Sequence, residues 1–378
     1  MSASPTIWLV NHFVPPDPAP TARLLAELGG ALQARGWNVR FVGSGSGYRA
    51  GVRRGWRRWL RDLVTHFVLF AKGLWGTHPD VILCLTDPPA LVFTMACVAV
   101  FRRSRLVHWP MDVYPQIAGR LGALGEESFV YRVIDGATRW GLSRCAAVVC
   151  LDEDMRQQAG YGAKEGASVI APWPPAGLAV SQDCPVPKPG LIRWLYSGNL
   201  GRAHEFETLL RAQKMLEDQG LPFELVFQGG GVERDVAQRR AADLDLRSCR
   251  WLDYAEDEDL VPSLLRAHVV IATQKAEMRG LLWPSKLAVL QALPRPIVWV
   301  GPHDGAVAAM LRNQENPAGI FAPGDTEPLA RWLGDHASVF RAGAAQSVDS
   351  GLIRGKLDAA REVALAKWHG ILQGFLAG

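Results

Sequence analysis

The sequence has no hydrophobic run long enough to cross a membrane. A spanning helix needs about 18–20 consecutive apolar residues, whereas the longest candidate, residues 90–101, has 12 and includes a threonine. We expect it to form a buried helix. Residues 1–5 also lead directly into the apolar run 7–10, without the basic region and small-residue cleavage site of a signal peptide. These absences predict a cytoplasmic chain without a spanning helix.

Cysteine is scarce and lacks metal-binding spacing. The six cysteines include no Cys-x-x-Cys pair, and Cys84, Cys97 and Cys150 lie in or beside apolar runs. We expect free thiols in a reducing compartment, rather than a disulfide framework or a zinc site. An excess of one charge is also absent, because the net charge is only +4 over 378 residues. The composition therefore gives no reason to expect nucleic-acid binding.

Short apolar runs alternate with helical patterns in the first half of the chain. Leu24, Leu25, Leu28 and Leu32 recur at helical spacing and predict a helix over 21–35. The apolar runs predict strands at 7–10, 38–43, 81–85, 105–109 and 146–151. Strands separated by helices form parallel sheets, and strands that are almost entirely apolar are covered on both faces.

A second series of the same kind follows a proline-rich linker at 185–190. A long final helix is expected within 352–378. The strands of this series are predicted at 192–198, 223–230, 249–254, 269–273 and 296–301. The predicted fold class is α/β, with doubly wound Rossmann-like domains at 1–182 and 190–351. Because such sheets bind ligands beyond the carboxyl ends of their strands, we expect a cleft between the domains to hold the chemistry.

The segment 51–75 is basic and aromatic. On a helical wheel its tryptophans, Trp56 and Trp59, lie with leucines and phenylalanines on one side. The opposite side carries Arg54, Arg57, Arg58 and Arg61. This composition is typical of a helix that lies in the plane of an anionic inner-membrane surface. The alternative is a core-facing helix with a solvated basic face.

Two glycine-rich turns follow strands in the second half. The first, YSGNLGRAH at 196–204, precedes a predicted helix at 206–213. Free amides at a helix start and a nearby arginine favour a pyrophosphate, and the predicted ligand-binding residues are Gly198, Asn199, Gly201 and Arg202. The second turn contains Gly229 and Gly230, which leave room for a ligand. A purely structural turn is the alternative for both.

A third candidate lies at 274–287, QKAEMRGLLWPSKL. Pro284 suits the first turn of a helix, so Ser285 and Lys286 are expected at a helix start that favours phosphate. Gly280 and Leu281 precede them in a flexible stretch. A solvated loop with incidental charges is the alternative.

Taken together, these motifs resemble glycosyltransferase family 4, in the branch that builds bacterial surface polysaccharides on lipid carriers. The matching segments run in the family's order and cover nearly the whole chain. They are VNHFVPPDPAPTARL (10–24), TDPPAL (86–91), WPMDVYPQIA (109–118), YSGNLGRAHEFETLL (196–210), FQGGGVERD (227–235), GLLWPSKL (280–287) and FAPGDTEPLA (321–330).

The resemblance implies a GT-B fold, retention of anomeric configuration, no cofactor and no bound metal. It places a UDP- or GDP-sugar donor on the second domain, with its pyrophosphate at Gly198, Asn199, Gly201 and Arg202. Ser285 and Lys286 would meet the donor sugar and phosphates. The final helix, 352–378, would return to the first domain.

The chain departs from the family at one position. Many members carry two acidic residues spaced Glu-x7-Glu, and the second grips the ribose; here that position is Val289. Gln291 is the nearest polar side chain, and Glu277 is the remaining candidate for a sugar-side acid. The ribose contact is therefore left open.

The first domain would hold the acceptor. Asp17, Thr21 and Arg23 follow the first strand and are predicted to meet acceptor or donor phosphate, with capping of a helix by Thr21 as the alternative. Asp87 and Asp112 each follow a strand end. We predict that Asp112 is the acceptor-side carboxylate, acting as a base or an orienting group. The alternatives to Asp112 are His12 and His108.

The predicted function is a retaining glycosyltransferase that moves a sugar to a polyprenyl-diphosphate-linked glycan in bacterial exopolysaccharide, O-antigen or capsule assembly. Its catalytic residues would be Asp112, Glu277, Arg202 and Lys286. A GT-B nucleotide-sugar epimerase and a catalytically inactive binding module are the alternatives. A dehydrogenase is disfavoured, because no Gly-x-Gly-x-x-Gly follows the first strand.

Overall fold

A computed structural model describes residues 4–45, 56–158, 167–181, 185–187, 190–344 and 348–376. Its first parallel sheet consists of β1 (Thr6–Val10), β2 (Asn38–Val42), β3 (Val81–Cys84), β4 (Arg105–His108), β5 (Ala147–Cys150) and β6 (Ala167–Val169). The strand order is β2-β1-β3-β4-β5-β6. The runs that form β1, β3 and β5 are almost entirely apolar and buried, as strands covered on both faces must be.

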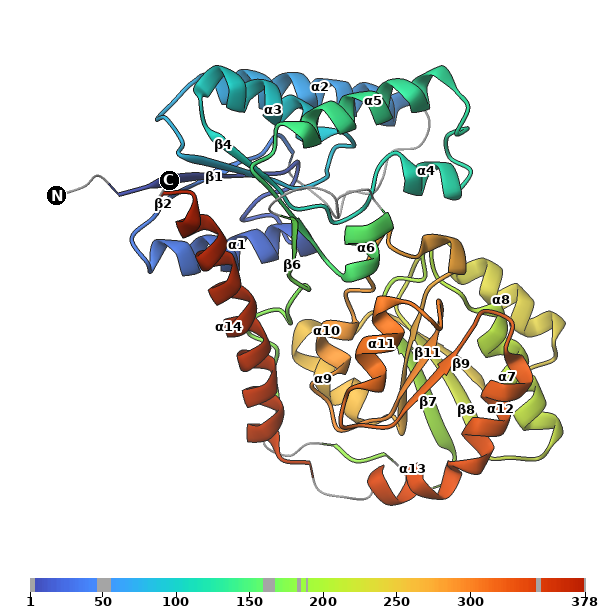
Figure 1. Cartoon of the computed structure of the whole chain (residues 1–378). Helices are drawn as coiled ribbons and strands as arrows, with labels where there is room; N and C mark the ends of the chain where they lie inside the picture. Colours follow the sequence, from blue (N-terminus) through green and yellow to red (C-terminus); the bar gives the residue numbers. More distant parts are fainter. Residues whose placement is uncertain are drawn as a thin grey trace. The chain divides into compact units, whose positions relative to one another are not determined.

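Helices cover both faces of this sheet. They are α1 (Pro20–Gln33), α2 (Trp56–Leu74), α3 (Leu91–Arg102), α4 (Gln116–Arg120), α5 (Phe129–Ser143) and α6 (Glu153–Gln158). Helix α3 packs against both α2 and α5, and Figure 1 shows these three helices as one layer, with α1 on the other face of the sheet.

The second parallel sheet has the order β12-β11-β10-β7-β8-β9. Its strands are β7 (Ile192–Ser197), β8 (Phe223–Gln228), β9 (Cys249–Leu252), β10 (Val269–Thr273), β11 (Ile297–Val300) and β12 (Ala318–Phe321). The helices of this series are α7 (Glu207–Asp218), α8 (Arg234–Asp243), α9 (Asp257–Leu265), α10 (Leu287–Leu290), α11 (Ala306–Arg312), α12 (Thr326–Asp335), α13 (Ala337–Ala344) and α14 (Ser350–Gly374). A short 3-10 helix, η2, covers Ala276–Met278.

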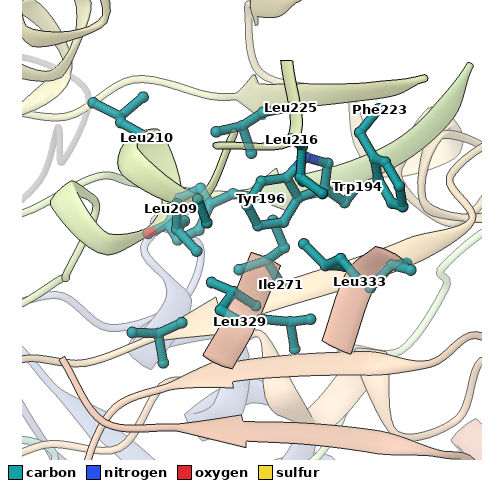
Figure 2. Close-up of a cluster of buried hydrophobic side chains, with 14 of the residues drawn as sticks. Trp194, Tyr196, Leu209, Leu210, Leu216, Phe223, Leu225, Ile271, Leu329 and Leu333 are labelled. Carbon is teal, nitrogen blue, oxygen red and sulfur yellow. The ribbon is translucent and has the colours of Figure 1, made fainter. Parts of the chain in front are cut away.

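One face of the second sheet packs against α7 and α12 in an apolar core that Figure 2 shows in close-up. Trp194 of β7 lies fully buried in this core. Its indole Nε1 donates to Oε1 of Gln213 at 2.9 Å, and the Gln213 amide donates in turn to the Phe223 carbonyl. Burial of Gln213 costs little free energy, because its side-chain oxygen and its side-chain amide each have a hydrogen-bond partner.

The predicted alternation of strands and helices is confirmed in both sheets. Strands β6 and β12, at one edge of each sheet, were not predicted from the sequence. Both are short, and the residues of β6 are only partly buried. An edge strand is covered less than a central one, so its apolar signal is weaker.

The helix expected at 90–101 is not fully buried. It forms α3, but Phe93, Val100 and Phe101 are exposed. An all-apolar segment shows no periodicity, so its exposed side is invisible in the sequence. None of the helices in the described ranges is both long and apolar enough to cross a membrane.

The chain divides into two compact units. The first comprises Met1–Pro175, Gly280–Trp283 and Arg361–Gly378, and the second comprises Ala176–Arg279 and Pro284–Ala360. This division differs from the predicted domains in three ways. The first segment of the first unit ends at Pro175, whereas the first domain was predicted to end at 182. Gly280–Trp283 belongs to the first unit, and α14 is shared, because its residues from Arg361 onward count with the first unit and the earlier ones with the second.

Three tryptophans hold the end of α14 within the first unit. Trp368 is fully buried, with its ring centroid 4.7 Å from that of Trp109, which stacks on Trp173 at 5.6 Å. The Trp173 indole donates to Oε2 of Glu27 at 2.8 Å. Burial of such rings contributes more than most single contacts in a core.

Replacing Trp368 with alanine is expected to lower the free energy of unfolding by about 3–5 kcal/mol, because it empties a fully buried site. Trp75→Ala is the matched control: this ring is 75% exposed, and its loss should change the free energy by less than about 0.5 kcal/mol. Urea unfolding of both variants measures the difference. Equal effects would contradict the assigned role of the tryptophan cluster.

Candidate functional site

The turns that follow β7 and β8 are joined backbone to backbone. The Gly198 amide donates to the Gln228 carbonyl at 2.8 Å, and the Leu200 amide donates to the Gly230 carbonyl at 2.7 Å. The Leu200 carbonyl accepts from the Glu233 amide at 3.1 Å. Both turns lie at the carboxyl ends of neighbouring strands, where doubly wound sheets bind their ligands.

The glycines of the second turn are required by this contact. Gly229 and Gly231 have φ values of 125° and 127°, in the left-handed region. A Cβ atom at Gly229 would overlap the Gly198 carbonyl, and one at Gly231 would overlap the Leu200 carbonyl. The space beside Gly229, which the sequence analysis left open for a ligand, is therefore filled by the neighbouring turn. Beside Gly230 lies the ring of Tyr254.

Lys286 places a buried ammonium group against the first turn. Its Nζ atom lies 3.2 Å from the centroid of the Tyr196 ring and has no hydrogen-bond partner among the described residues. A Cβ atom built on Gly198 would lie 3.6 Å from this Nζ, in ordinary contact. Burial lowers the pKa of Lys286 well below its usual range, because water no longer stabilises the charge.

The groups around this ammonium are neutral. The Tyr196 hydroxyl donates to the Asn199 carbonyl at 2.9 Å, and burial raises the pKa of Tyr196. Nδ1 of His204 donates to the Thr273 carbonyl at 2.8 Å. Burial and the charge of Lys286 lower the pKa of His204 to about 3. Within the described residues, no carboxylate neutralises Lys286.

The first turn offers unpaired amides to an anion. The backbone N–H groups of Asn199, Gly201 and Arg202 have no hydrogen-bond partner in the described part of the chain. The Arg202 side chain is exposed. These amides and the Lys286 ammonium are donors for which the described residues supply no acceptor, as a site for an anion requires.

The two helix starts that were expected to bind phosphate do not offer the expected dipole and free amides. Helix α7 begins only at Glu207, and the Glu205 carboxylate accepts from the Thr208 amide at 2.8 Å. An acidic cap already occupies the position where an anion was expected. Helix α10 has only four residues, with Lys286 as its N-cap, so its dipole is small.

Two of the remaining predicted donor residues lie at the surface. Glu277 in η2 and Ser285 are both exposed. Arg279 pairs with Asp304 at 3.0 Å. Val289, which stands where the family has its ribose-binding acid, is buried in α10 with 6% exposure. A carboxylate at that position would lose its hydration, so the apolar residue fits the local packing.

Gly280 and Leu281 belong to the first unit. The Leu281 carbonyl accepts from the Val113 amide at 2.8 Å, and Leu282 forms an antiparallel bridge with Asp112. Gly280 has a φ of 68°. The segment Gly280–Trp283 therefore holds the loop that follows β4, where Asp112 lies.

Asn11 organises the predicted acceptor side and was missed by the sequence analysis. It is fully buried directly after β1. Its Nδ2 donates to Oγ1 of Thr21 at 3.3 Å, and its Oδ1 accepts from the Asp87 amide at 3.2 Å. This contact joins the loops after β1 and β3. A short polar residue at the end of an apolar strand was the available signal.

The capping role considered for Thr21 is wrong. The N-cap of α1 is Ala19, because the helix begins at Pro20. The Asp17 carboxylate accepts from the Ala19 amide at 2.9 Å. Asp17 thus orders the turn before the helix, and Thr21 accepts from Asn11 instead. Arg23 is half-buried within α1.

Asp112 has a carboxyl group whose pKa is shifted toward neutral pH. Burial and the charge of Asp87 raise the pKa of Asp112 to about 6. The two alternative histidines are neutral. Burial lowers the pKa of His108 to about 4, and it also lowers the pKa of His12. Carboxyl groups with raised pKa values are typical of functional sites.

The basic segment forms α2 from Trp56 onward. Arg54 and the side chains of Trp56, Arg57 and Arg58 lie outside the described residues. Trp59 is 46% exposed. Arg61 pairs with Asp62 at 2.8 Å.

Tyr254 is a further residue that the sequence analysis did not select. It follows β9, is exposed, and its hydroxyl donates to Oδ1 of Asn199 at 3.3 Å. Its ring covers Gly230. An exposed aromatic ring beside a site for an anion provides a surface on which a planar group can stack.

Comparisons with known proteins fit this architecture. The chain is 24% identical over 270 residues to the probable glycosyltransferase WbjE of Pseudomonas aeruginosa, covering 67% of this chain and 65% of that protein. It is 33% identical over 102 residues to the putative colanic acid biosynthesis glycosyl transferase WcaI of Escherichia coli K12, covering 26% of this chain and 24% of that protein. The alignments thus span less than two thirds of either relative. No family model matches.

The similarity to solved structures extends over the whole chain. HepE of Anabaena, solved in complex with UDP and glucose, matches 97% of this chain and 99% of its own, with a TM-score of 0.63 and 13% identity. At this identity the match establishes the fold. The fold is therefore GT-B, with two Rossmann-like α/β domains.

Replacing Gly229 with alanine is expected to separate the two joined turns. The new methyl group overlaps the Gly198 carbonyl and forces a left-handed backbone on alanine, so the free energy of unfolding should fall by at least about 2 kcal/mol. Gly30→Ala is the control, because nothing lies within 4 Å of that position in α1. It should raise stability by about 0.5–1 kcal/mol. Thermal unfolding distinguishes these opposite signs.

The carboxyl group of Asp112 is expected to titrate near pH 6 in the folded protein. ¹³C NMR of labelled aspartate carboxyls measures this, against the usual value of 3.8. In Asp87→Asn the midpoint should move to lower pH, because removal of a nearby negative charge makes ionisation of Asp112 easier. An unchanged titration midpoint of Asp112 in Asp87→Asn would contradict the proposed coupling between these two carboxyl groups.

Proposed function

We propose that the protein is a glycosyltransferase that uses a nucleotide-diphosphate sugar in polysaccharide biosynthesis. The observation that carries this proposal is the buried, unpaired ammonium of Lys286 against the glycine turn at Gly198. A buried charge without a partner is costly, and a diphosphate would supply the missing partner. Open amides of the same turn would bind the remaining phosphate oxygens.

The comparisons support this choice of ligand. WbjE and WcaI are described as glycosyltransferases, and WcaI is assigned to colanic acid biosynthesis. HepE was crystallised with UDP and glucose and with UDP-glucose. A diphosphate at Lys286 would also supply the negative charge that no carboxylate of the described residues supplies to this group.

In the proposed reaction, a hydroxyl oxygen of the acceptor forms a bond to the anomeric carbon of the donor sugar. The bond from that carbon to the diphosphate oxygen breaks, and its electron pair stays on the diphosphate. The hydroxyl proton passes to the departing phosphate on the same face of the sugar, so the configuration is retained. Lys286 and Arg202 stabilise the developing negative charge, and this electrostatic term is usually the largest in such a reaction.

The finer parts of the proposal concern the acceptor. We assign to Asp112 the orientation of the acceptor hydroxyl, because a buried carboxyl group in the loop after β4 can accept a hydrogen bond from that hydroxyl while the proton passes to the departing phosphate. A polyprenyl-diphosphate-linked glycan is the proposed acceptor class, and Glu277 is the proposed sugar-side acid. The reaction as proposed uses no metal and proceeds at the cytoplasmic face of the membrane.

One observation favours a second candidate. The buried Val289 leaves the ribose without its usual acidic partner, so the protein could instead be a binding module that holds the nucleotide sugar without transfer. Release of nucleotide in the presence of acceptor separates an enzyme from this module. An epimerase would convert the donor sugar without any acceptor.

Replacing Lys286 with methionine tests the site. Without bound nucleotide, Lys286→Met should be more stable than the wild type, because it removes a buried amino group that has no partner among the described residues. Its sugar transfer should fall by about 10²–10³-fold, together with its affinity for the nucleoside diphosphate. Thermal shift, calorimetric titration of UDP or GDP and release from labelled donor measure these effects.

Lys214→Met is the control, because Lys214 pairs with Asp218 on the surface; this variant should retain full transfer. Arg202→Ala should reduce transfer as Lys286→Met does, without the gain in stability, since Arg202 is exposed. Unchanged turnover in both site variants would contradict the phosphate assignment. A loss of stability in Lys286→Met would indicate a structural role for this lysine instead.

A further inference from the structure

Large apolar side chains are exposed on the outward surfaces of α2, α3 and α5. Helix α2 exposes five of them, α3 three and α5 four. They are Trp59, Leu60, Leu63, Val64 and Phe67; Phe93, Val100 and Phe101; and Phe129, Val130, Val133 and Trp140. We call this surface the three-helix face. Phe67, Phe101 and Phe129 are each more than two-thirds exposed, which is unusual for phenylalanine.

The three helices form one continuous layer. Helix α3 packs on α2 and on α5, and Figure 1 shows all three over the same face of the first sheet. Gly141 of α5 lets the helices approach closely, because a Cβ atom there would overlap the backbone at Phe93. The rings of Phe93 and Trp140 lie 5.3 Å apart. The exposed side chains of α3 and α5 therefore belong to one surface.

The inward sides of these helices already complete the core of the unit. Leu69, Met95 and Thr138 are buried beneath the three-helix face. The outward apolar residues are thus additional to what the fold needs. Continuous exposed apolar patches on this scale mark a surface that binds something.

The charges around this surface select an anionic partner. In the sequence, the three helices, with the residues that end α3 and α5, carry nine arginines and lysines against two aspartates. The side chains of Arg57 and Arg58 lie outside the described residues, and Lys72 and Arg102 donate to backbone carbonyls. Both aspartates are already paired, Asp62 with Arg61 and Asp135 with Arg139. The arginines Arg103, Arg132, Arg139 and Arg144 are exposed.

The same charges disfavour a second copy of the chain as the partner. A symmetric contact places the same surface on both sides, so the exposed arginines of the two copies would face and repel each other. An anionic lipid surface instead pairs each arginine with a phosphate, at about 1 kcal/mol per residue near the surface. Arg144 lies over the Trp140 ring at 5.3 Å, and a cation beside an indole is typical of the membrane interface.

We propose that the three-helix face docks on the surface of an anionic lipid bilayer. The helices lie in the plane of the membrane, with their phenylalanines and tryptophans at the boundary of headgroups and acyl chains. This surface is wider than the basic segment 51–75, because α3 and α5 contribute more than half of its exposed apolar side chains. The proposal does not depend on the donor site, since the lipid contact requires no sugar transfer.

Co-sedimentation of the full chain with vesicles tests the proposal. Phosphatidylcholine vesicles with and without phosphatidylglycerol provide the anionic and neutral surfaces. The wild type should bind the anionic vesicles and bind less as salt is raised. Val100→Asp in α3 and Val133→Asp in α5 should each weaken binding by roughly tenfold, because a charge replaces an inserted apolar group.

Two matched controls lie outside the three-helix face. Val363 of α14 is 56% exposed, against 57% for Val100, and Val339 of α13 is 52% exposed, against 51% for Val133. Val363→Asp and Val339→Asp should bind vesicles within about twofold of the wild type. All four sites are exposed, so each variant should keep the melting temperature of the wild type.

Three results would overturn the proposal. The first is wild-type protein that remains in the supernatant with anionic vesicles. The second is binding by Val100→Asp and Val133→Asp that equals binding by the controls, which would remove α3 and α5 from the surface. The third is a dimer in light scattering that Val133→Asp dissociates, without vesicle binding, which would make the face a contact between copies. Loss of vesicle binding leaves nucleotide binding unchanged, so the two proposals fail separately.

Discussion

The turns after β7 and β8 approach each other closely because Gly229 and Gly231 carry no side chains at the points of contact. Their hydrogen bonds fix the path of the first turn from Gly198 to Leu200. That path in turn leaves the next amides open and brings the Gly198 backbone beneath the ammonium of Lys286. The geometry of the anion site therefore depends on the contact between the main chains of these two turns. Lys286 adds its ammonium group to that arrangement.

Loops of the first unit are also held together by hydrogen bonds. There the contact depends on a polar side chain, whereas in the second unit it depends on glycines. Asn11 is fully buried and joins the loops after β1 and β3 through Thr21 and Asp87. The antiparallel bridge at Leu282 holds the loop that carries Asp112. In both units, loops at the carboxyl ends of parallel strands are held by hydrogen bonds between segments distant in sequence. Regular secondary structure supplies the frame on which these loops are fixed.

The central strands were predictable because they are apolar throughout, and β10 was predicted with its observed bounds. The edge strand β6 was not, because its partial burial leaves a weak pattern. Helix starts were predicted to within one or two residues for α1, α7 and α14, but the groups that accept from their first amides were not. A capping side chain such as Glu205 decides how the end is satisfied, and several polar residues near each start were compatible with that role.

The glycine turn and Lys286 were identifiable from the sequence, but their contact was not. They are separated by more than 80 residues, and nothing local indicates that Nζ of Lys286 lies over the Tyr196 ring. The exposed side of α3 was hidden for a related reason, because a uniformly apolar helix carries no periodic signal. Burial and long-range contact are properties of the folded chain, so these features became visible only in three dimensions.

The open amides and the buried ammonium have a consequence for turnover. On the proposed reaction, the groups that bind the donor diphosphate bind the departing nucleoside diphosphate equally well. Once the proton taken from the acceptor hydroxyl has passed to solvent, that product carries more negative charge on its terminal phosphate than the donor does, because the sugar no longer esterifies it. Its departure also leaves Lys286 buried without a counter-charge. The binding free energy that stabilises the departing nucleoside diphosphate therefore also slows its dissociation. Product release is then expected to be the slowest step of the cycle.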